Sequence, residues 1–309
     1  MTNTSTDTAE TAESRIRDGL IFGVVAYTLW GLFPLFLKLL SSVGAVEILT
    51  HRILWSVPFA ALLLLVRSQW SEVKTAISDK RVLGALALAA IAISANWLIY
   101  VWSVINDQIL QASLGYYINP LMYVAAGVIV LGEKLRRAQI AAVSLATIGV
   151  VVLTVGAGVF PWIALSLAVL FTAYGYIRKM ANVGALPGLF LEVCMLSPLA
   201  LLYLLWLMNA GEAMFLSGDA GLDALLIFAG PVTVIPLVCF ALAARRLKLS
   251  TLGFLQYIGP TFQFALGIYF GEAFTPAHAV AFGLIWIALA IFSFDAARAN
   301  RKVMPAKGV

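Results

Sequence analysis

Ten long apolar stretches, separated by short polar gaps, run along this chain of 309 residues. An α-helix needs about 20 residues to cross a bilayer core of about 30 Å. The apolar runs are continuous rather than alternating, and backbone groups within lipid must satisfy one another, so we expect helices. The predicted spans are 19–40, 44–66, 82–104, 109–131, 138–155, 158–177, 186–207, 222–243, 249–270 and 276–296. This pattern predicts an all-α membrane protein with ten transmembrane helices.

Positive charge alternates along the gaps between these stretches. Lys and Arg occupy the two tails and the even-numbered gaps, whereas the odd-numbered gaps contain neither. Of the 20 Lys and Arg residues, only Lys38 and Arg52 lie within apolar stretches. Short loops rich in Lys and Arg remain cytoplasmic. Both termini are therefore expected to be cytoplasmic.

Composition excludes a water-soluble protein. Apolar residues make up 62% of the chain and charged residues 11%, against about 45–50% and 25% in soluble domains. The basic residues flank the spans instead of forming one face, so we expect a lipid bilayer and no nucleic acid as partner. Cys194 and Cys239 lie inside apolar stretches, where free cysteines pack as small hydrophobes. His51 and His278 lie on different spans, no Walker-type loop is present, and we expect neither a metal nor a cofactor.

The two halves of the chain resemble each other at an offset of 140 residues. This offset superimposes the segment 117–120, Tyr-Ile-Asn-Pro, on 257–260, Tyr-Ile-Gly-Pro. It also pairs Pro58 with Pro198 and Gly127 with Gly267, and a slip of one residue superimposes Gly132-Glu133 on Gly271-Glu272. Chance similarity between apolar segments is the alternative explanation, but one offset at several points argues against it.

Each half contains five spans, and an odd number makes the second half enter the membrane from the opposite side. The halves then form an inverted five-plus-five repeat, an architecture of secondary transporters. The expected organisation is a disordered cytoplasmic tail (1–17), a first five-helix repeat (18–155), a second, inverted five-helix repeat (156–297) and a cytoplasmic tail (298–309).

Two prolines near the middle of predicted spans indicate where a binding site could form. Pro120 and Pro260 each remove a helical hydrogen bond, and the freed carbonyls must meet protein or a water-lined cavity. We expect helix kinks there, with flat and polar side chains around them; simple packing kinks and interhelical packing by Asn96 remain open. The candidate substrate-binding residues are Trp30, His51, Arg52, Asn96, Tyr100, Tyr117, Asn119, Glu192, Gln256 and Tyr257.

Charged residues within spans are costly and usually face a cavity or a partner. Arg52 and Glu192 are related by the 140-residue offset and carry opposite charges. One hypothesis is that they bind the charged ends of a substrate or hold a gate; a structural ion pair is the alternative. Lys38 and Glu47 lie near span ends, where snorkelling to the interface is the simpler interpretation.

Several strings of residues carry a resemblance to a known family. They are Ala26-Tyr27, Trp30-Gly31 and Lys38, Glu47-Ile48-Leu49-Thr50-His51-Arg52 with Trp55-Ser56, Asn96-Trp97, Ala112-Ser113-Leu114-Gly115-Tyr116, Ile118-Asn119-Pro120, Gly132-Glu133, Leu247 through Gly253, and Gln256-Tyr257-Ile258-Gly259-Pro260-Thr261. With them, residues 18–297 resemble the EamA family of the drug/metabolite transporter superfamily, in its RarD branch.

That resemblance implies ten helices in the EamA fold, both termini inside, and ATP-independent movement of small metabolites or drugs. The branch is associated by name with chloramphenicol sensitivity. We therefore expect a secondary transporter of the bacterial inner membrane for amino-acid-like, aromatic or chloramphenicol-like compounds, working by alternating access around a midplane cavity. It would be no enzyme, and either a monomer or a homodimer. The alternatives are a channel-like protein, a non-transporting receptor or a membrane-embedded lipid-modifying enzyme. Related small exporters use a glutamate in their first span, whereas the first span here carries Lys38.

Overall fold

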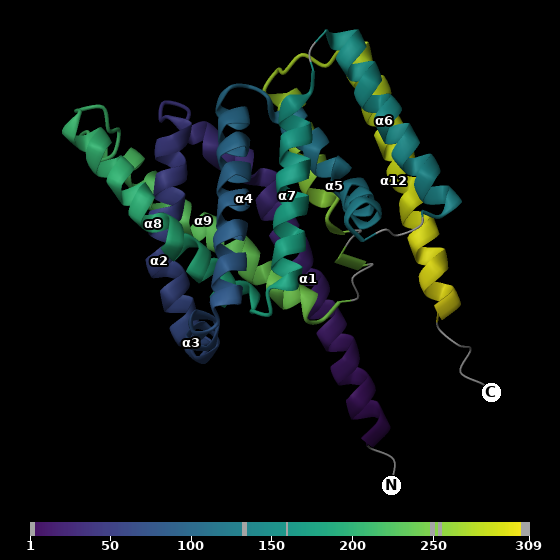
Figure 1. The fold of residues 1–309 in the computed structure, drawn as a ribbon, viewed down its shortest axis with the longest axis horizontal. Helices are drawn as coiled ribbons and strands as arrows, with labels where there is room; N and C mark the ends of the chain where they lie inside the picture. Colours follow the sequence, from purple (N-terminus) through teal and green to yellow (C-terminus); the bar gives the residue numbers. More distant parts are fainter. Residues whose placement is uncertain (1–3, 132–134, 159, 248–250, 253–254, 304–309) are drawn as a thin grey trace.

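The computed structural model describes residues 4–131, 135–158, 160–247, 251–252 and 255–303, and these form helices joined by short connections (Figure 1). The helices are α1 (Thr4–Leu39), α2 (Ala45–Val66), α3 (Trp70–Ser78), α4 (Lys80–Ile105), α5 (Ile109–Leu131), α6 (Arg137–Ala157), α7 (Trp162–Met180), α8 (Ala185–Asn209), α9 (Ala220–Ala244), α11 (Ile258–Tyr269) and α12 (Pro276–Val303).

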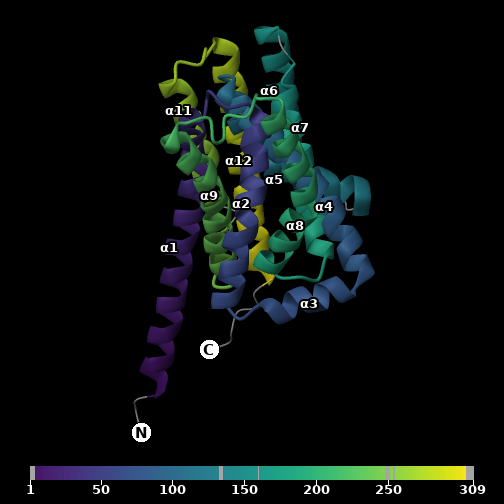
Figure 2. The same cartoon turned by 90° about the vertical axis from the view of Figure 1, so that its left-hand side faces the viewer.

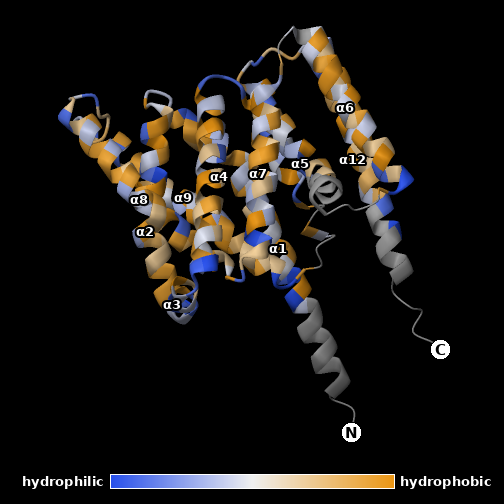
Figure 3. Ribbon diagram, in the orientation of Figure 1, coloured by the Kyte–Doolittle hydropathy of each residue, from blue (hydrophilic) through white to orange (hydrophobic). Residues whose placement is uncertain are grey.

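Eight of these helices are long and apolar enough to cross a membrane, namely α1, α2, α4, α6, α7, α8, α9 and α12. Apolar residues dominate the middle of these helices and hydrophilic residues gather mostly at their ends (Figure 3). The chain is therefore a multi-pass membrane protein.

The ninth predicted span, 249–270, is not a single helix in the described residues. A turn at Gln256 and Tyr257 interrupts the helix, although Tyr257 keeps right-handed helical backbone angles (φ −69°, ψ −15°), and α11 begins at Ile258. Pro260 is consequently the third residue of α11 and not a mid-span kink. A proline in the first turn costs little, because the N–H that it lacks would have had no helical partner there. Pro120 does lie inside α5.

The two ends of the chain are more helical than expected. The tail 1–17 was predicted to be disordered, yet α1 is helical from Thr4, and α12 continues to Val303 through the first half of the predicted tail 298–309. Once an apolar helix has formed, extending it requires no new nucleation, and Ala and Glu favour the helical state.

One helix was not predicted at all. The helix α3 lies in a gap that the sequence assigned to a basic loop. It buries Val73 and Ala76, and the ring of Trp70 lies 5.3 Å from that of Phe190 on α8. Apolar residues at every third position give this short segment one buried face.

The helices pack in a few extensive pairs. α1 lies against α9 and α11, α2 against α8 and α9, α4 against α7, and α5 against α7 and α11. α6 and α12 pair with each other along one flank (Figures 1 and 2). An ion pair of 2.7 Å between Arg136 and Asp295 joins the start of α6 to the second half of α12. Helix α1 begins and helix α12 ends on the side of the bundle that carries α3.

Two pairs of helix starts follow the 140-residue spacing. α2 begins after Gly44 and α8 after Gly184. α4 begins after Asp79 and α9 after Asp219, and each of these carboxylates accepts hydrogen bonds from the backbone N–H groups two and three residues later. Such N-caps satisfy amides that the helix leaves free. The same capping solution therefore recurs at matching positions.

Candidate functional site

A buried arginine is at the centre of the candidate site. Arg52 lies seven residues into α2, roughly 10 Å along its axis, and only 4% of its surface is exposed. Its guanidinium carbon lies 4.8 Å from the ring centre of Phe33 on α1 and 4.6 Å from that of Trp97 on α4. Both aromatic rings therefore stabilise the cation through cation–π contacts.

The edge of the guanidinium is only partly occupied. Nε donates a hydrogen bond of 3.1 Å to Oγ1 of Thr233 on α9. A terminal nitrogen of Arg52, Nη1, is buried and has no hydrogen-bond partner. Within the described residues, no carboxylate lies at ion-pair distance from Arg52. Tyr100 and Tyr116 lie beside this group, because Tyr100 stacks on Phe33, whose ring faces the cation, and Tyr116 contacts Tyr100 edge-on. We refer to Phe33, Trp97, Tyr100, Tyr116 and Thr233 as the Arg52 cage.

The polar groups around the cage differ in how well they are satisfied. Tyr100 stacks on Phe33 at 6.0 Å, and its hydroxyl is buried without a partner. Tyr116 meets Tyr100 edge-on at 5.6 Å and donates to Oδ1 of Asn96 at 3.4 Å. The amide of Asn96 also donates to the carbonyl of Leu167 on α7 at 3.0 Å. Asn96 therefore joins α4 to α7 and orients Tyr116, while Tyr100 keeps a free donor.

Glu192 lies in a separate cluster. It is fully buried seven residues into α8, and its carboxylate lies 3.4 Å from Nε of Arg178 on α7. The hydroxyl of Tyr174 donates to Glu192 at 3.3 Å. Arg178 also donates to the carbonyl of Gly184 at 3.1 Å. The structure thus pairs Glu192 with Arg178, and does not bring it to Arg52.

His51 belongs to a group that holds the connection between α8 and α9. Its Nδ1 accepts a hydrogen bond of 3.1 Å from Trp55, and its ring lies 4.6 Å from that of Phe215. One turn earlier, the carboxylate of Glu47 accepts from the backbone N–H groups of Met214 (2.8 Å) and Phe215 (3.1 Å). Glu47 and His51 on this face of α2 therefore hold residues 214–215, in the connection between α8 and α9, against α2.

Two further contacts fasten the same side of the bundle. Lys38 forms an ion pair of 2.5 Å with Asp107, so it is paired and not simply snorkelling. The carboxylate of Glu272 accepts from the N–H groups of Ile109 and Leu110 at the start of α5. Burial raises the pKa of Glu272 above its ordinary value, although these two N–H groups oppose the shift. Its expected counterpart, Glu133, lies outside the described residues.

The repeat-related tyrosines meet beside the break before α11. The rings of Tyr117 and Tyr257 stack with centres 6.4 Å apart. Tyr117 hydrogen-bonds through its hydroxyl to Thr261 at 2.8 Å, and Thr261 donates to the carbonyl of Tyr257 at 2.6 Å. Ser113 donates to the carbonyl of Pro260 at 2.8 Å. These contacts satisfy backbone groups where the helix is interrupted.

Three candidate residues remain, namely Asn119, Gln256 and Trp30. Asn119 is fully buried, and neither polar atom of its amide has a hydrogen-bond partner. Gln256 is half-buried at the break itself. The ring of Trp30 lies 5.6 Å from Tyr27 and 5.9 Å from Phe240, so Trp30 joins α1 to α9 one turn from the Arg52 cage.

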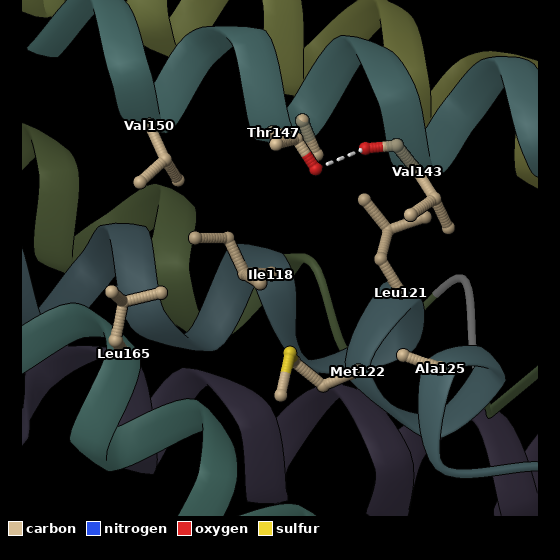
Figure 4. A pocket seen from close by; sticks show the side chains of 9 residues that line it. Ile118, Leu121, Met122, Ala125, Val143, Thr147, Val150 and Leu165 are labelled. Carbon is tan, nitrogen blue, oxygen red and sulfur yellow. Dashed lines mark hydrogen bonds between the residues drawn. The ribbon is translucent and has the colours of Figure 1, made fainter. Parts of the chain in front are cut away.

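A separate hollow of about 180 Å³ opens between α5, α6 and α7 (Figure 4). Its polar group, the Thr147 hydroxyl, is bonded at 2.9 Å to the carbonyl of Val143. The hollow is therefore apolar and contains none of the candidate binding residues. Its lining is Ile118, Leu121, Met122, Ala125, Val143, Ala146, Thr147, Val150 and Leu165.

Sequence reasoning missed several members of these clusters. Trp97 and Tyr116 belong to the flat side chains that the sequence analysis expected around the kinks, although neither was chosen as a binding residue. Phe33 and Thr233 lie within apolar runs, where nothing in the sequence marks them as members of a binding site. Arg178 was interpreted as a loop charge that sets orientation, whereas it belongs to the last turn of α7 and is largely buried.

Comparison with known proteins establishes the family. The EamA-like transporter family matches residues 17–155. Protein RarD of Streptomyces exfoliatus is 49% identical over 94% of this chain and 93% of its own length. This chain belongs to the EamA-like transporter family, as a RarD-type member. It is accordingly a membrane transporter of the drug/metabolite superfamily.

Other relatives place this transporter among bacterial proteins. Protein RarD of Escherichia coli is 44% identical over 93% of this chain and 97% of its own length. The Chloramphenicol-sensitive protein RarD of Pseudomonas aeruginosa is 29% identical over 92% of this chain and 96% of its own length. A solved crystal structure shares the fold, with a TM-score of 0.55, 20% identity, and coverage of 88% of this chain and 96% of that one.

Proposed function

We propose that this protein is a secondary transporter that carries small metabolites or drugs across the bacterial inner membrane by alternating access. The observation that carries the proposal is the Arg52 cage, which gathers a buried cation, aromatic rings and hydroxyl groups from five helices. A charge within a membrane bundle usually marks a substrate or ion pathway. Aromatic walls with a few polar groups are typical of small-molecule sites.

The packing on the two sides of the cage supports alternating access. On the side away from the chain termini, Glu47, Lys38 and Glu272 fasten the connections, and Leu37, Ile48 and Leu226 are fully buried. On the opposite side, Trp30, Tyr174 and Gln256 remain partly exposed. The side with Glu47, Lys38 and Glu272 supplies the closed end that a carrier needs in each half of its cycle, although the other side is also packed, with Leu64, Leu86 and Glu192 fully buried. A channel would need an open polar path.

An inverted five-plus-five repeat with ten passes is part of the proposal. The 140-residue spacing of the capped helix starts and the stacking of Tyr117 on Tyr257 support it. Arg52 and Glu192 each lie seven residues into a helix, as repeat-related positions on opposite halves would. Basic residues near α3 and the start of α1 favour a cytoplasmic location for both termini. Labelling of Arg67→Cys from outside intact cells would contradict that orientation.

Counterflow in proteoliposomes tests the transport proposal. Liposomes holding purified protein are loaded with an unlabelled compound, and entry of the labelled compound is followed. Phenylalanine represents amino-acid-like and aromatic compounds, and chloramphenicol is chosen because it is named for the Pseudomonas relative. The proposal expects saturable accumulation that empty liposomes lack. Flux without saturation would favour a channel, and no flux of either compound class would favour a receptor.

A further inference from the structure

Arg52 is a buried cation without a counter-charge in the part of the chain that the structure describes. Lys38 pairs with Asp107, and Arg178 pairs with Glu192. Glu47 accepts hydrogen bonds from two backbone N–H groups, which stabilise its negative charge. Arg52 has the Thr233 hydroxyl, two ring faces and a buried Nη1 without any partner. A buried cation held only in this way favours an anion as its missing partner.

The geometry restricts how such an anion approaches. Phe33 and Trp97 lie 4.8 and 4.6 Å from the guanidinium carbon, so a ligand cannot approach from the sides that these two rings occupy. Thr233 already occupies the Nε position, so the donors left for a ligand include Nη1. A planar carboxylate suits such donors, since it accepts two parallel N–H bonds from a guanidinium. The unpartnered hydroxyl of Tyr100 adds a neutral donor in the same cage, since the ring of Tyr100 stacks on Phe33, which faces the guanidinium.

The cage discriminates against a second charge on the ligand. No acidic side chain belongs to the Arg52 cage, and the carboxylate of Glu192 is already paired with Arg178. The ammonium of an amino acid would therefore lie beside Arg52 with nothing to neutralise it. Aromatic side chains that could contact the ring of a ligand lie beside the cage, where Tyr116 contacts Phe171 edge-on at 6.0 Å.

We propose that Arg52 and Tyr100 bind the carboxylate of an aromatic monoanion, and that this monoanion is preferred to its neutral amide and to the zwitterionic amino acid. The inference rests on the proposed function, since it names the substrate class of the same site. It assigns Arg52 to the substrate and Glu192 to the protein scaffold.

Equilibrium binding to the purified full-length protein tests this assignment. The probes are 3-phenylpropionate, 3-phenylpropionamide and phenylalanine, which share one ring and differ in charge. Binding is read from intrinsic fluorescence, because the indole of Trp97 lies 4.6 Å from the guanidinium, and from the shift in melting temperature. We expect 3-phenylpropionate to bind about tenfold more tightly than either other probe. Equal affinities, or no binding of 3-phenylpropionate, would overturn the proposal.

Single-residue variants test whether Arg52 and Tyr100 cause the preference for 3-phenylpropionate. Arg52→Gln should abolish it, and Arg52→Lys should keep part of it, because the positive charge remains while the planar donors are lost. Arg67→Gln removes the same charge from the exposed end of the same helix and should behave as wild type. Tyr100→Phe keeps the ring and should weaken carboxylate binding several-fold without affecting the amide, and it serves where Arg52→Gln does not fold. A preference that persists in Arg52→Gln, or in Tyr100→Phe at full strength, would overturn the assignment.

Counterflow separates this inference from the transport proposal. Arg52-dependent binding of 3-phenylpropionate without counterflow of any probe supports the anion site and contradicts transport. Saturable counterflow of chloramphenicol that is unchanged in Arg52→Gln, together with equal binding of the three probes, supports transport and overturns the anion site.

Discussion

Tyr117 and Tyr257 stack on each other with ring centres 6.4 Å apart and ring planes inclined by 24°. They occupy matching positions in the two halves of the sequence, 140 residues apart. Residues related by a two-fold axis meet each other when they lie on that axis, so this contact supports an axis between α5 and α11. Both tyrosines also adjoin the interrupted backbone before α11, which makes the region a joint between the halves.

Removing the hydroxyl of Tyr117 tests this joint. In Tyr117→Phe the hydroxyl of Thr261 loses a partner, and we expect the free energy of unfolding to fall by about 1 kcal/mol. Thermal unfolding in detergent measures the change. Tyr269→Phe is the matched control, because Tyr269 is 78% exposed and should be neutral. Equal melting temperatures for Tyr117→Phe and wild type would show that the bond contributes nothing.

The close approach of α2 and α9 depends on one glycine. A Cβ added at Gly230 would overlap the backbone carbonyl of Trp55, which cannot rotate away. We expect Gly230→Ala to force the helices apart and to cost about 1–3 kcal/mol of unfolding free energy. It should also disturb the contact of Arg52 with Thr233, which joins the same two helices.

Gly84→Ala is the control for this substitution. Gly84 lies in α4, and a Cβ there would meet no atom within 4 Å. In this position alanine favours the helix, so stability should rise by about 0.5–1 kcal/mol. If both substitutions stabilise the protein, α2 and α9 are less closely packed than the structure indicates.

Hydropathy predicted the long helices well because membrane spans are defined by length and apolarity. The predicted spans 44–66 and 186–207 correspond to α2 and α8 within two residues at each end. The turn at Gln256 and Tyr257 was missed because the apolar character of a run does not show where the helix is interrupted. The helix α3 was missed because it is too short and too polar for a span.

The candidate site was predictable only in part. A charge within an apolar run is conspicuous, and Arg52 was found in that way. Phe33 and Thr233 were not, because an aromatic or hydroxyl residue in such a run gives no signal. Thr233 is 181 residues from Arg52, and only the packing of α9 on α2 brings the two together. The pairing of Glu192 with Arg178 likewise depends on how α7 meets the start of α8.

Glu192 and Arg178 should behave as a coupled structural pair. Glu192→Gln leaves Arg178 without its counter-charge, and we expect a loss of about 3 kcal/mol in unfolding free energy, with a similar loss for Arg178→Gln. The double variant should recover much of this loss, because no unpaired charge remains. A double-mutant cycle of thermal unfolding measures the coupling.

The same variants distinguish a scaffold role from substrate binding. If Glu192 serves the scaffold, the double variant should regain counterflow together with stability. A double variant that is stable but transports nothing would instead favour Glu192 as a substrate contact, as the sequence first suggested. Additive losses in the cycle would contradict the ion pair itself.

Glu272 should make stability depend on pH. Burial raises its pKa above the ordinary value of 4.5; the N–H groups of Leu110 and Ile109 and the charge of Lys38 oppose this shift, and Asp107 adds to it. The folded protein therefore binds this proton more tightly than the unfolded chain does. Stability should fall as pH rises from 4.5 through the raised pKa of the folded state, because the unfolded chain loses its proton first.

Melting temperatures between about pH 4 and about pH 8 measure this dependence. Glu272→Gln should flatten this part of the profile, since the amide still accepts a hydrogen bond and cannot be charged. Glu212→Gln, which removes an exposed carboxylate on the same side of the bundle, should retain the wild-type slope. If Glu272→Gln and wild type lose stability in parallel over this interval, the titration belongs to another group. Glu272 would then be ionised throughout this pH interval, and its carboxylate would accept the N–H bonds from the start of α5 in that form.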